Sequence, residues 1–149
     1  MANTIEIQKY LPHRTPMLMV DLIVSMDHEN VKTIFTIAED NIFVENGQFV
    51  EAGLVENAAQ TCSAIVGSSY FVNEEGEDIP GVRVIGFISS IKSVKIHALP
   101  KAGTEITTTA VLQSSFDMGT YTTCTMQCTT YNGETLLLEG DINLFIQQR

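Results

Sequence analysis

The chain has 149 residues, the size of one ordinary domain, and a formal net charge of −10 at pH 7. Apolar residues make up 44% of it, which is enough for a sizeable core and excludes wholesale disorder. The acidic balance argues against a nucleic-acid partner, because phosphate binding needs a basic surface. No apolar run of about 18 residues occurs, so no membrane span is predicted.

The N-terminus and the cysteines predict a protein of the cytoplasm. The first residues, MANTIEIQKYLPHR, lack the basic and apolar regions of a secretory signal. Cys62, Cys124 and Cys128 are odd in number and lie in apolar segments, so a disulfide framework is not expected. Cys124 and Cys128 share one face of a predicted strand, but no second ligand pair accompanies them, so no metal site is predicted.

The first half of the chain predicts a short helix, two strands and one long helix, in that order. Residues 5–11 have amphipathic helical spacing, which ends at Pro12. The apolar run 16–27 and the alternating run 30–40 favour strands, and the short turn between them predicts a hairpin. Residues 51–71 change to helical spacing and are apolar or small on most sides, so this helix is expected to be buried.

The second half is predicted to be almost entirely β after an acidic loop at 73–80. The strand-like run 82–98 leads to a Pro-Lys-Ala-Gly turn, and the next run breaks near 117–119. Asn132–Gly133 is a strong hairpin signal, and the run 134–147 then closes the chain. One long helix with three or four later antiparallel strands predicts an α+β domain, a curved antiparallel sheet packed on a central helix.

Four stretches, taken in order, resemble the hotdog-fold 3-hydroxyacyl-[acyl-carrier-protein] dehydratases over nearly the whole chain. They are YLPHRTPMLMVDLI (10–23), NGQFVEAGLVENAAQ (46–60), IGFISSIKSVKIHALPKAGTEI (85–106) and YNGETLLLEGDINLFI (131–146). The first stretch is the most specific. YLPHRTPM and ENAAQT are also similar to a diverged branch that is found with aryl-polyene pigment synthesis. The resemblance implies that residues 1–149 form a single hotdog, dehydratase-like domain.

The chemistry that this resemblance implies is elimination of water from a 3-hydroxyacyl thioester, which gives a trans-2-enoyl thioester. Elimination needs a base for the C2 proton, an acid for the leaving hydroxyl and a donor that polarises the thioester carbonyl. In the family, a histidine in a Gly-His-Phe turn is the base and a helix carboxylate from the other subunit is the acid. A backbone N–H near the start of the helix polarises the carbonyl.

Carried onto this sequence, the family pattern is met only in part. Glu56 matches the helix carboxylate, and Gly47 and Phe49 match the turn, but Gln48 stands where the histidine is expected. The connection from turn to helix is also shorter, and Gly53 is the predicted amide donor. A carboxamide cannot carry a proton away, and loss of a general base typically costs about 10²- to 10⁴-fold in rate.

Three replacements for the missing base stay open, and two other functions stand beside dehydration. His13 or His97 could serve as the base, Glu56 could act alone, or a partner subunit could supply a histidine in a heterodimer. The first alternative function is an acyl thioesterase, in which Glu56 attacks the thioester or directs a water while Gln48 holds the substrate. The second is a non-catalytic acyl-binding or partner subunit of a heteromeric dehydratase.

The remaining predictions concern substrate, carrier and assembly. The predicted substrate-binding residues are Gly53, Phe49, Gln60 and His13, and Gln60 is expected to form a hydrogen bond across a dimer. Lys92, Lys95 and Lys101 are predicted to receive acyl-carrier protein or the phosphate of coenzyme A, or else to be solvated strand-edge lysines. The resemblance implies a homodimer, a higher oligomer or a heterodimer with a related subunit, and no metal or redox cofactor. Asp21 is predicted to tie down the end of its strand.

Overall fold

The structure is a computed structural model that describes residues 11–70, 75, 77 and 84–148. The short helix expected at 5–11, apart from Leu11, and most of the loop expected at 73–80 lie outside these residues. The elements are β1 (Leu22–Met26), β2 (Asn30–Thr36), β3 (Val44–Glu45), β4 (Gln48–Phe49), α2 (Glu51–Tyr70), β5 (Val84–Ile96), β6 (Glu105–Asp117), β7 (Thr122–Asn132) and β8 (Thr135–Gln148).

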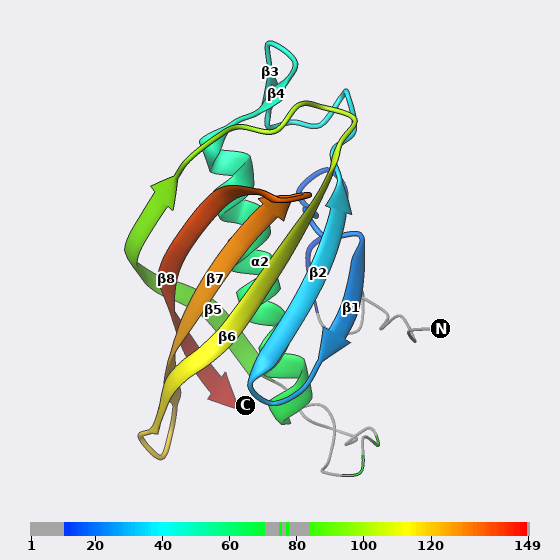
Figure 1. Ribbon diagram of the computed structural model, residues 1–149. Helices are drawn as coiled ribbons and strands as arrows, with labels where there is room; N and C mark the ends of the chain where they lie inside the picture. The colour runs from blue at the N-terminus through cyan, green and yellow to red at the C-terminus, as the bar shows by residue number, and fades with distance from the viewer. Residues whose placement is uncertain (1–10, 71–74, 76, 78–83, 149) are drawn as a thin grey trace.

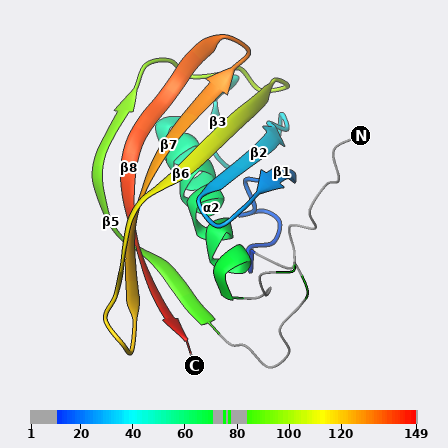
Figure 2. The same ribbon diagram turned by 60° about the horizontal axis from the view of Figure 1, so that its bottom comes forward.

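Six strands form one antiparallel sheet in the order β1-β2-β6-β7-β8-β5. The sheet curves around α2, which lies against its concave face (Figures 1 and 2). The expected α+β hotdog fold, a curved antiparallel sheet around one long helix, is therefore confirmed. β5 ends the sheet on one side, so its outer edge has no neighbouring strand among the described residues of the chain.

Small residues on α2 let the helix approach the sheet closely. Leu54, Ala58 and Cys62 are fully buried at helical spacing. The strands supply alternate residues to the same core: Ile106, Ala110, Met126, Cys128, Ile142 and Leu144. The period-2 burial of the strands and the helical spacing of α2 thus meet in one apolar layer, whose removal from water is the main favourable contribution to folding.

A buried polar layer crosses this core. The hydroxyls of Thr33 and Thr61 lie 2.7 Å apart, so β2 is joined to the helix. The Thr108 hydroxyl donates to Asn57 Oδ1 at 2.6 Å and lies 2.8 Å from the Thr130 hydroxyl, so β6 and β7 are joined to it as well. Buried polar groups are costly unless partnered. These pairings therefore favour one register of the helix on the sheet.

Near the N-terminus, the length of the first strand differs from the prediction, whereas the role of Asp21 agrees with it. The strand expected over 16–27 is shorter, because β1 begins only at Leu22. Met19 is held by a helix side chain, since its N donates to Gln60 Oε1 at 2.7 Å, and contact with β2 begins at Asp21, whose N donates to Ile34 O at 3.0 Å. Asp21 does tie down its strand, as predicted, because its carboxylate accepts from Thr36 N at 2.7 Å.

A small hairpin stands where the sequence suggested only a turn. β3 and β4 pair through a two-residue loop in which Asn46 and Gly47 have positive φ, 52° and 76°. Two consecutive positive φ values are typical of a type I′ turn, which Asn-Gly adopts readily. The hairpin projects beyond one end of the sheet, just before α2 (Figure 1).

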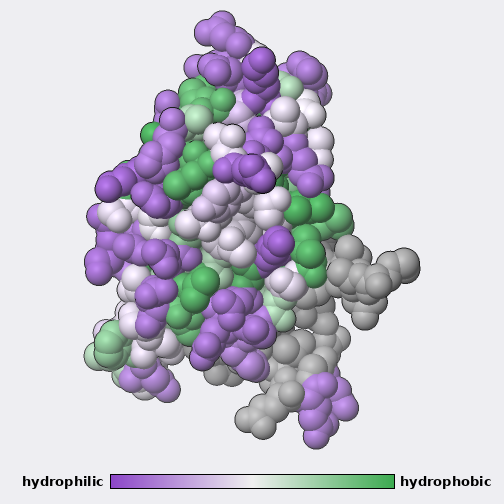
Figure 3. Space-filling view, viewed as in Figure 1, coloured by the Kyte–Doolittle hydropathy of each residue, from purple (hydrophilic) through white to green (hydrophobic). Residues whose placement is uncertain are grey.

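The outer, convex face of the sheet is mostly hydrophilic or neutral, with scattered apolar side chains (Figure 3). Threonine, glutamine and asparagine line its central strands, and they bond to one another across the strands, as in the 2.8 Å contact from Thr125 Oγ1 to Asn143 Oδ1.

Among the described residues, no helix has both the length and the apolar character needed to cross a membrane.

Candidate active site

Glu56 lies in the second turn of α2, on the side of the helix that does not pack on the sheet. Its neighbours Asn57 and Ala58 are buried, whereas Glu56 itself is half-buried. Gln60, one helical turn later, donates from Nε2 to Glu56 Oε1 at 2.8 Å. The carboxylate is therefore partly open to solvent, and one of its oxygens is held in place.

Gln60 also fixes the chain segment that follows the Leu-Pro-His-Arg motif. Its amide is fully buried and uses every polar atom: Oε1 accepts from Met19 N at 2.7 Å, and Nε2 donates to Met17 O at 2.8 Å. Asn57 reinforces the same segment, because its Nδ2 donates to Met19 O at 2.7 Å. These contacts all lie within one subunit, and the expected hydrogen bond of Gln60 across a dimer stays a prediction. Its role in substrate binding stays a prediction.

Gln48 is exposed on β4, and its backbone is held from two sides. β3 pairs with β4 on one side. On the other side, Phe49 N donates to Pro100 O and Ala102 N donates to Gly47 O, both at 2.9 Å. The turn that matches the family's catalytic turn is thus a rigid hairpin braced by the loop that precedes β6.

These pairings place three side chains in one row across the hairpin. Glu45 is the register partner of Gln48 on β3, and a single antiparallel bridge pairs Gln48 with Lys101. Directly paired residues of antiparallel strands point to the same face, and all three residues are exposed. A carboxylate and an ammonium therefore flank the carboxamide. Glu45 matches no residue of the family pattern in the sequence, although Asn46–Gly47 is a signal for this hairpin.

The structure places Phe49 and Gly53 in the core. Phe49 is fully buried, with its ring centroid 5.9 Å from that of Phe35. A Cβ on Gly53 would lie 2.6 Å from the Phe49 ring, so a glycine is required there for the ring to fit. Gly53 N donates to Val50 O at 2.9 Å, in the first turn of the helix. Their predicted contacts with substrate stay predictions, and the Gly53 amide would have to exchange this bond to polarise a carbonyl.

The two histidines proposed as alternative bases lie in different surroundings. His13 is half-buried, and its Nδ1 is a buried polar atom for which the described part of the chain offers no hydrogen-bond partner. His97 is exposed and lies 3.4 Å from Glu139 across the β5–β8 pair. Among the described residues, no hydrogen bond or ion pair joins either histidine to Glu56 or Gln48.

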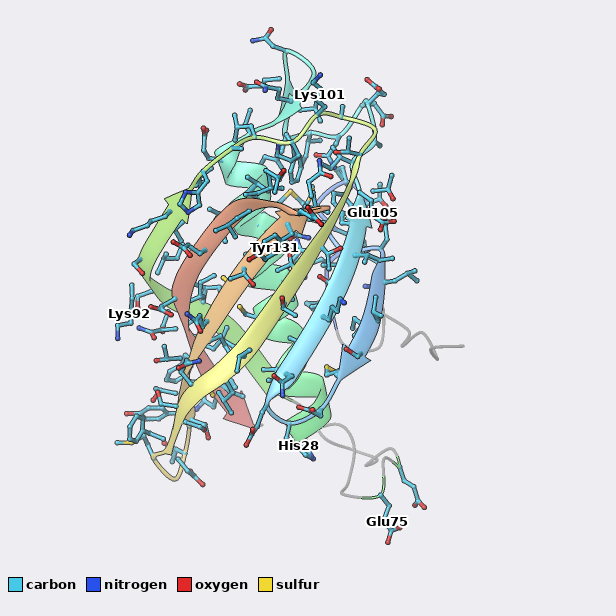
Figure 4. All side chains as sticks on the ribbon, in the orientation of Figure 1. His28, Glu75, Lys92, Lys101, Glu105 and Tyr131 are labelled. Atoms are coloured by element: carbon cyan, nitrogen blue, oxygen red, sulfur yellow. The ribbon has the colours of Figure 1, made fainter. Side chains whose placement is uncertain are left out.

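The lysines predicted to bind the carrier do not gather on one surface. Lys101 lies at the end of the molecule that carries the hairpin, whereas Lys92 lies well away from it along β5 (Figure 4). Lys95 is on β5 as well, opposite Glu139. Of the three, Lys101 is therefore the one that the structure places beside Gln48.

The three cysteines are buried with free thiols. The Cys62 thiol donates a hydrogen bond to the Cys128 sulfur, which raises the pKa of Cys62 and lowers that of Cys128. Burial raises the pKa of Cys124. No group of three or more potential metal ligands occurs among the residues that the structure describes. The thiols therefore belong to the core between α2 and β7.

Comparison with known sequences points in the same direction as these residues. The sequence model of the ApeP-like family, described as ApeP dehydratase, matches residues 5–149. A 3-hydroxyacyl-[acyl-carrier-protein] dehydratase FabZ of Rhizobium leguminosarum bv. trifolii is 42% identical over 74 residues, 43% of this chain and 45% of the relative. The FabZ of Rhizobium etli is 40% identical over the same shares. The chain thus spans about half the length of the curated relatives that it matches.

Solved structures share the fold at low sequence identity. The dehydratase heterocomplex ApeI:P from Xenorhabdus doucetiae has a TM-score of 0.75 and 17% identity, covering 95% of this chain and 90% of that one. A hypothetical thioesterase with coenzyme A from Streptococcus pneumoniae has a TM-score of 0.64 and 16% identity, covering 85% and 86%. Likenesses at these identities establish the hotdog fold alone.

Proposed function

Because this chain belongs to the ApeP-like dehydratase family, we propose that it acts on 3-hydroxyacyl thioesters and eliminates water to give trans-2-enoyl thioesters. The observation that carries the proposal is the placement of Glu56. It is a half-buried carboxylate on the outward side of the central helix, and Gln60 holds one of its oxygens at 2.8 Å. A held and accessible carboxyl group is the kind of group that general acid–base catalysis requires.

In this proposal Glu56 gives its proton to the departing hydroxyl. Gln60 donates to Oε1, so Oε2 is the oxygen that is left to face the substrate. The positioning matters because Gln60 is itself fixed by Met17 and Met19 of the N-terminal segment. The carboxyl group therefore keeps one orientation, which lowers the cost of reaching the reactive geometry.

The site is completed by a second subunit that pairs with the outer edge of β5. This strand has 13 residues and ends the sheet, and it exposes Phe87 (49%) and Ile91 (45%). A long, partly apolar edge strand is a template for pairing with another chain. We expect a homodimer or a heterodimer in which Glu56 of one subunit faces the hairpin of the other.

A second candidate function is supported by Gln48. A glutamine at the base position cannot accept the C2 proton, so this chain would be the partner subunit of a related dehydratase that supplies a histidine. The ApeI:P structure from Xenorhabdus doucetiae is described as a dehydratase heterocomplex. The thioesterase alternative has weaker support, since the likeness to a hypothetical thioesterase concerns the fold alone.

The acyl chain would arrive on acyl-carrier protein or on coenzyme A, in the cytoplasm. Lys101 is the cation nearest to the hairpin in the pairing scheme and would meet the anionic carrier there. Lys92 and Lys95 lie on β5, so their contribution depends on how a second subunit pairs with that edge.

One assay separates the three functions. The purified full chain is mixed with 3-hydroxyhexanoyl thioesters of pantetheine and of an acyl-carrier protein, and enoyl absorbance and free thiol are followed separately. Enoyl product without thiol supports dehydration, and thiol release supports hydrolysis. Saturable binding with neither product supports the partner subunit. Glu56→Gln should lower either rate by about 10²-fold or more, whereas Glu29→Gln, at the opposite end of the sheet, should leave both rates unchanged.

A further inference from the structure

The row Glu45–Gln48–Lys101 faces away from the core of its own subunit. Phe49, next to Gln48 on β4, is fully buried. Successive residues of a strand point to opposite faces, so Gln48 points outward, and its register partners Glu45 and Lys101 point the same way. This outward face is the one that a second subunit would meet.

The distances in such a row are set by strand pairing. Directly opposed residues of antiparallel strands have Cβ atoms about 4.5–5.5 Å apart. At this spacing Glu45 can place its carboxylate in front of the Gln48 amide. The Asn46–Gly47 turn and the bonds of β4 to the loop at 100–102 hold this spacing. The position of the missing imidazole is thus within reach of a different proton acceptor, which comes from the same turn.

We propose that Glu45 is the base of this site and takes the C2 proton that Gln48 cannot take. This inference rests on the proposed dehydration. It assigns the C2 proton to Glu45 of one subunit and the hydroxyl proton to Glu56 of the other. Gln48, between Glu45 and Lys101, donates a hydrogen bond from its amide to the substrate and positions it.

The step balances without a co-reactant. The Glu45 carboxylate removes the proton from C2, and the C–H electron pair becomes the C2–C3 double bond. The C3–O bond breaks, and the hydroxyl leaves as water with the proton of the Glu56 carboxyl group. Glu45 ends protonated and Glu56 ionised, and proton exchange with solvent restores both groups.

The charged groups around Glu45 come from the segments packed against the hairpin. Lys101 lies in the loop bridged to β4. Glu39 and Asp40 precede β3 in the segment joined to the hairpin through the bond from Val50 N to Phe43 O. Glu51 begins α2. A purely structural row would change the stability of the fold only slightly, with no effect on how the rate depends on pH.

The test is therefore a pH profile of kcat/KM for dehydration of 3-hydroxyhexanoyl-pantetheine. Two profiles can be told apart: with a carboxylate base the rate persists to a lower pH than with a neutral imidazole base. In both profiles the fall at high pH reports the acid. We expect the first profile for the unmodified chain. Glu45→Gln should lower kcat by about 10²- to 10⁴-fold with little change in KM. Glu45→Gln with Gln48→His should recover activity and show the second profile.

Glu29→Gln is the charge-matched control, and thermal unfolding of each variant separates lost chemistry from lost folding. An active chain whose Glu45→Gln variant keeps its rate overturns the role of Glu45 and leaves the proposed dehydration standing. If the unmodified chain is inactive and its Gln48→His variant is active, the role of Glu45 is also overturned, because the unmodified site then has no base. If neither the unmodified chain nor its Gln48→His variant forms enoyl product, the proposed dehydration fails, and the role of Glu45 fails with it.

Discussion

The side-chain amide of Gln60 donates to the carboxylate of Glu56 across one helical turn, at 2.8 Å, and the same amide binds Met17 O and Met19 N. One glutamine thus connects the candidate catalytic carboxylate with the segment that follows the Leu-Pro-His-Arg motif. The position of the Glu56 carboxylate and the stability of the fold therefore both depend on Gln60, because the Met19 N–H that donates to it is buried.

Gln60→Ala should lower the free energy of unfolding by about 1–3 kcal/mol, because it leaves the buried Met19 N–H without an acceptor. Urea unfolding measures the loss, and dehydration by the same variant should show a lower kcat, since Glu56 is no longer held. Gln113→Ala is the control. Gln113 is exposed, and its side-chain amide lies 3.4 Å from that of Gln127. Gln113→Ala should therefore change the free energy of unfolding by no more than about 0.5 kcal/mol. Equal stabilities of the two variants would contradict the role of Gln60.

The sequence predicted the elements that have strong local patterns. The helix expected over 51–71 is observed as Glu51–Tyr70, because small and apolar residues continue at helical spacing until its end. The hairpin predicted at Asn132–Gly133 forms, because long β-like runs flank it, but its two loop residues are Gly133 and Glu134, between the paired Asn132 and Thr135. The same dipeptide at Asn46–Gly47 gives a weaker signal, since its flanking strands have only two residues each.

The site depended on contacts that local patterns do not contain. Gln60 meets Met19 across 41 residues of sequence, and Asn57 meets Thr108 across 51. The bridge from Gln48 to Lys101 is of the same kind. Residue types and motif order identified Glu56 and Gln48. Their orientation and neighbours follow from tertiary packing, which sequence spacing alone does not fix.

The β1–β2 hairpin should lose stability in acid through Asp27. The N–H groups of Glu29 and then Asn30 donate to its carboxylate and hold the pKa of Asp27 below its ordinary 3.8. A folded-state pKa that is depressed gives stability that is present above the ordinary pKa and is lost as the pH falls through the folded value. The unmodified chain should therefore exceed Asp27→Asn in stability at pH 7, and the difference should shrink below about pH 3.8. Urea unfolding at a series of pH values measures it, and a constant difference would rule this explanation out.

The buried polar layer should be more sensitive to truncation than the polar outer face. Asn57→Ala removes the donor to Met19 O and the acceptor of the Thr108 hydroxyl. Each buried group left unpaired costs about 1–3 kcal/mol, so we expect a total loss of about 2–6 kcal/mol for the two groups. Asn143→Ala also breaks two side-chain bonds, but on the outer face, where water replaces them, and it should cost under about 1 kcal/mol. A loss for Asn143→Ala as large as that for Asn57→Ala would contradict the assignment of the layer.

Gly53→Ala provides a test of packing beneath the site. It should lower the free energy of unfolding, whereas this substitution within a helix usually raises it. Alanine in place of glycine within a helix normally stabilises it by about 0.5–1 kcal/mol. Here the new Cβ would lie 2.6 Å from two ring atoms of Phe49 and 2.8 Å from Phe43 Cβ, so the ring must move. Overpacking of this kind typically costs about 1–3 kcal/mol.

A double-mutant cycle with Phe49→Leu isolates that contact. The smaller side chain removes the ring that meets the new Cβ, so Gly53→Ala should cost less in the Phe49→Leu background than in the unmodified chain. Denaturant unfolding of the four proteins gives the coupling. Additive losses would mean that Gly53 is required for another reason. Because Phe49 adjoins Gln48 on β4, a shift of the ring in Gly53→Ala should also disturb the hairpin, and dehydration should fall with stability.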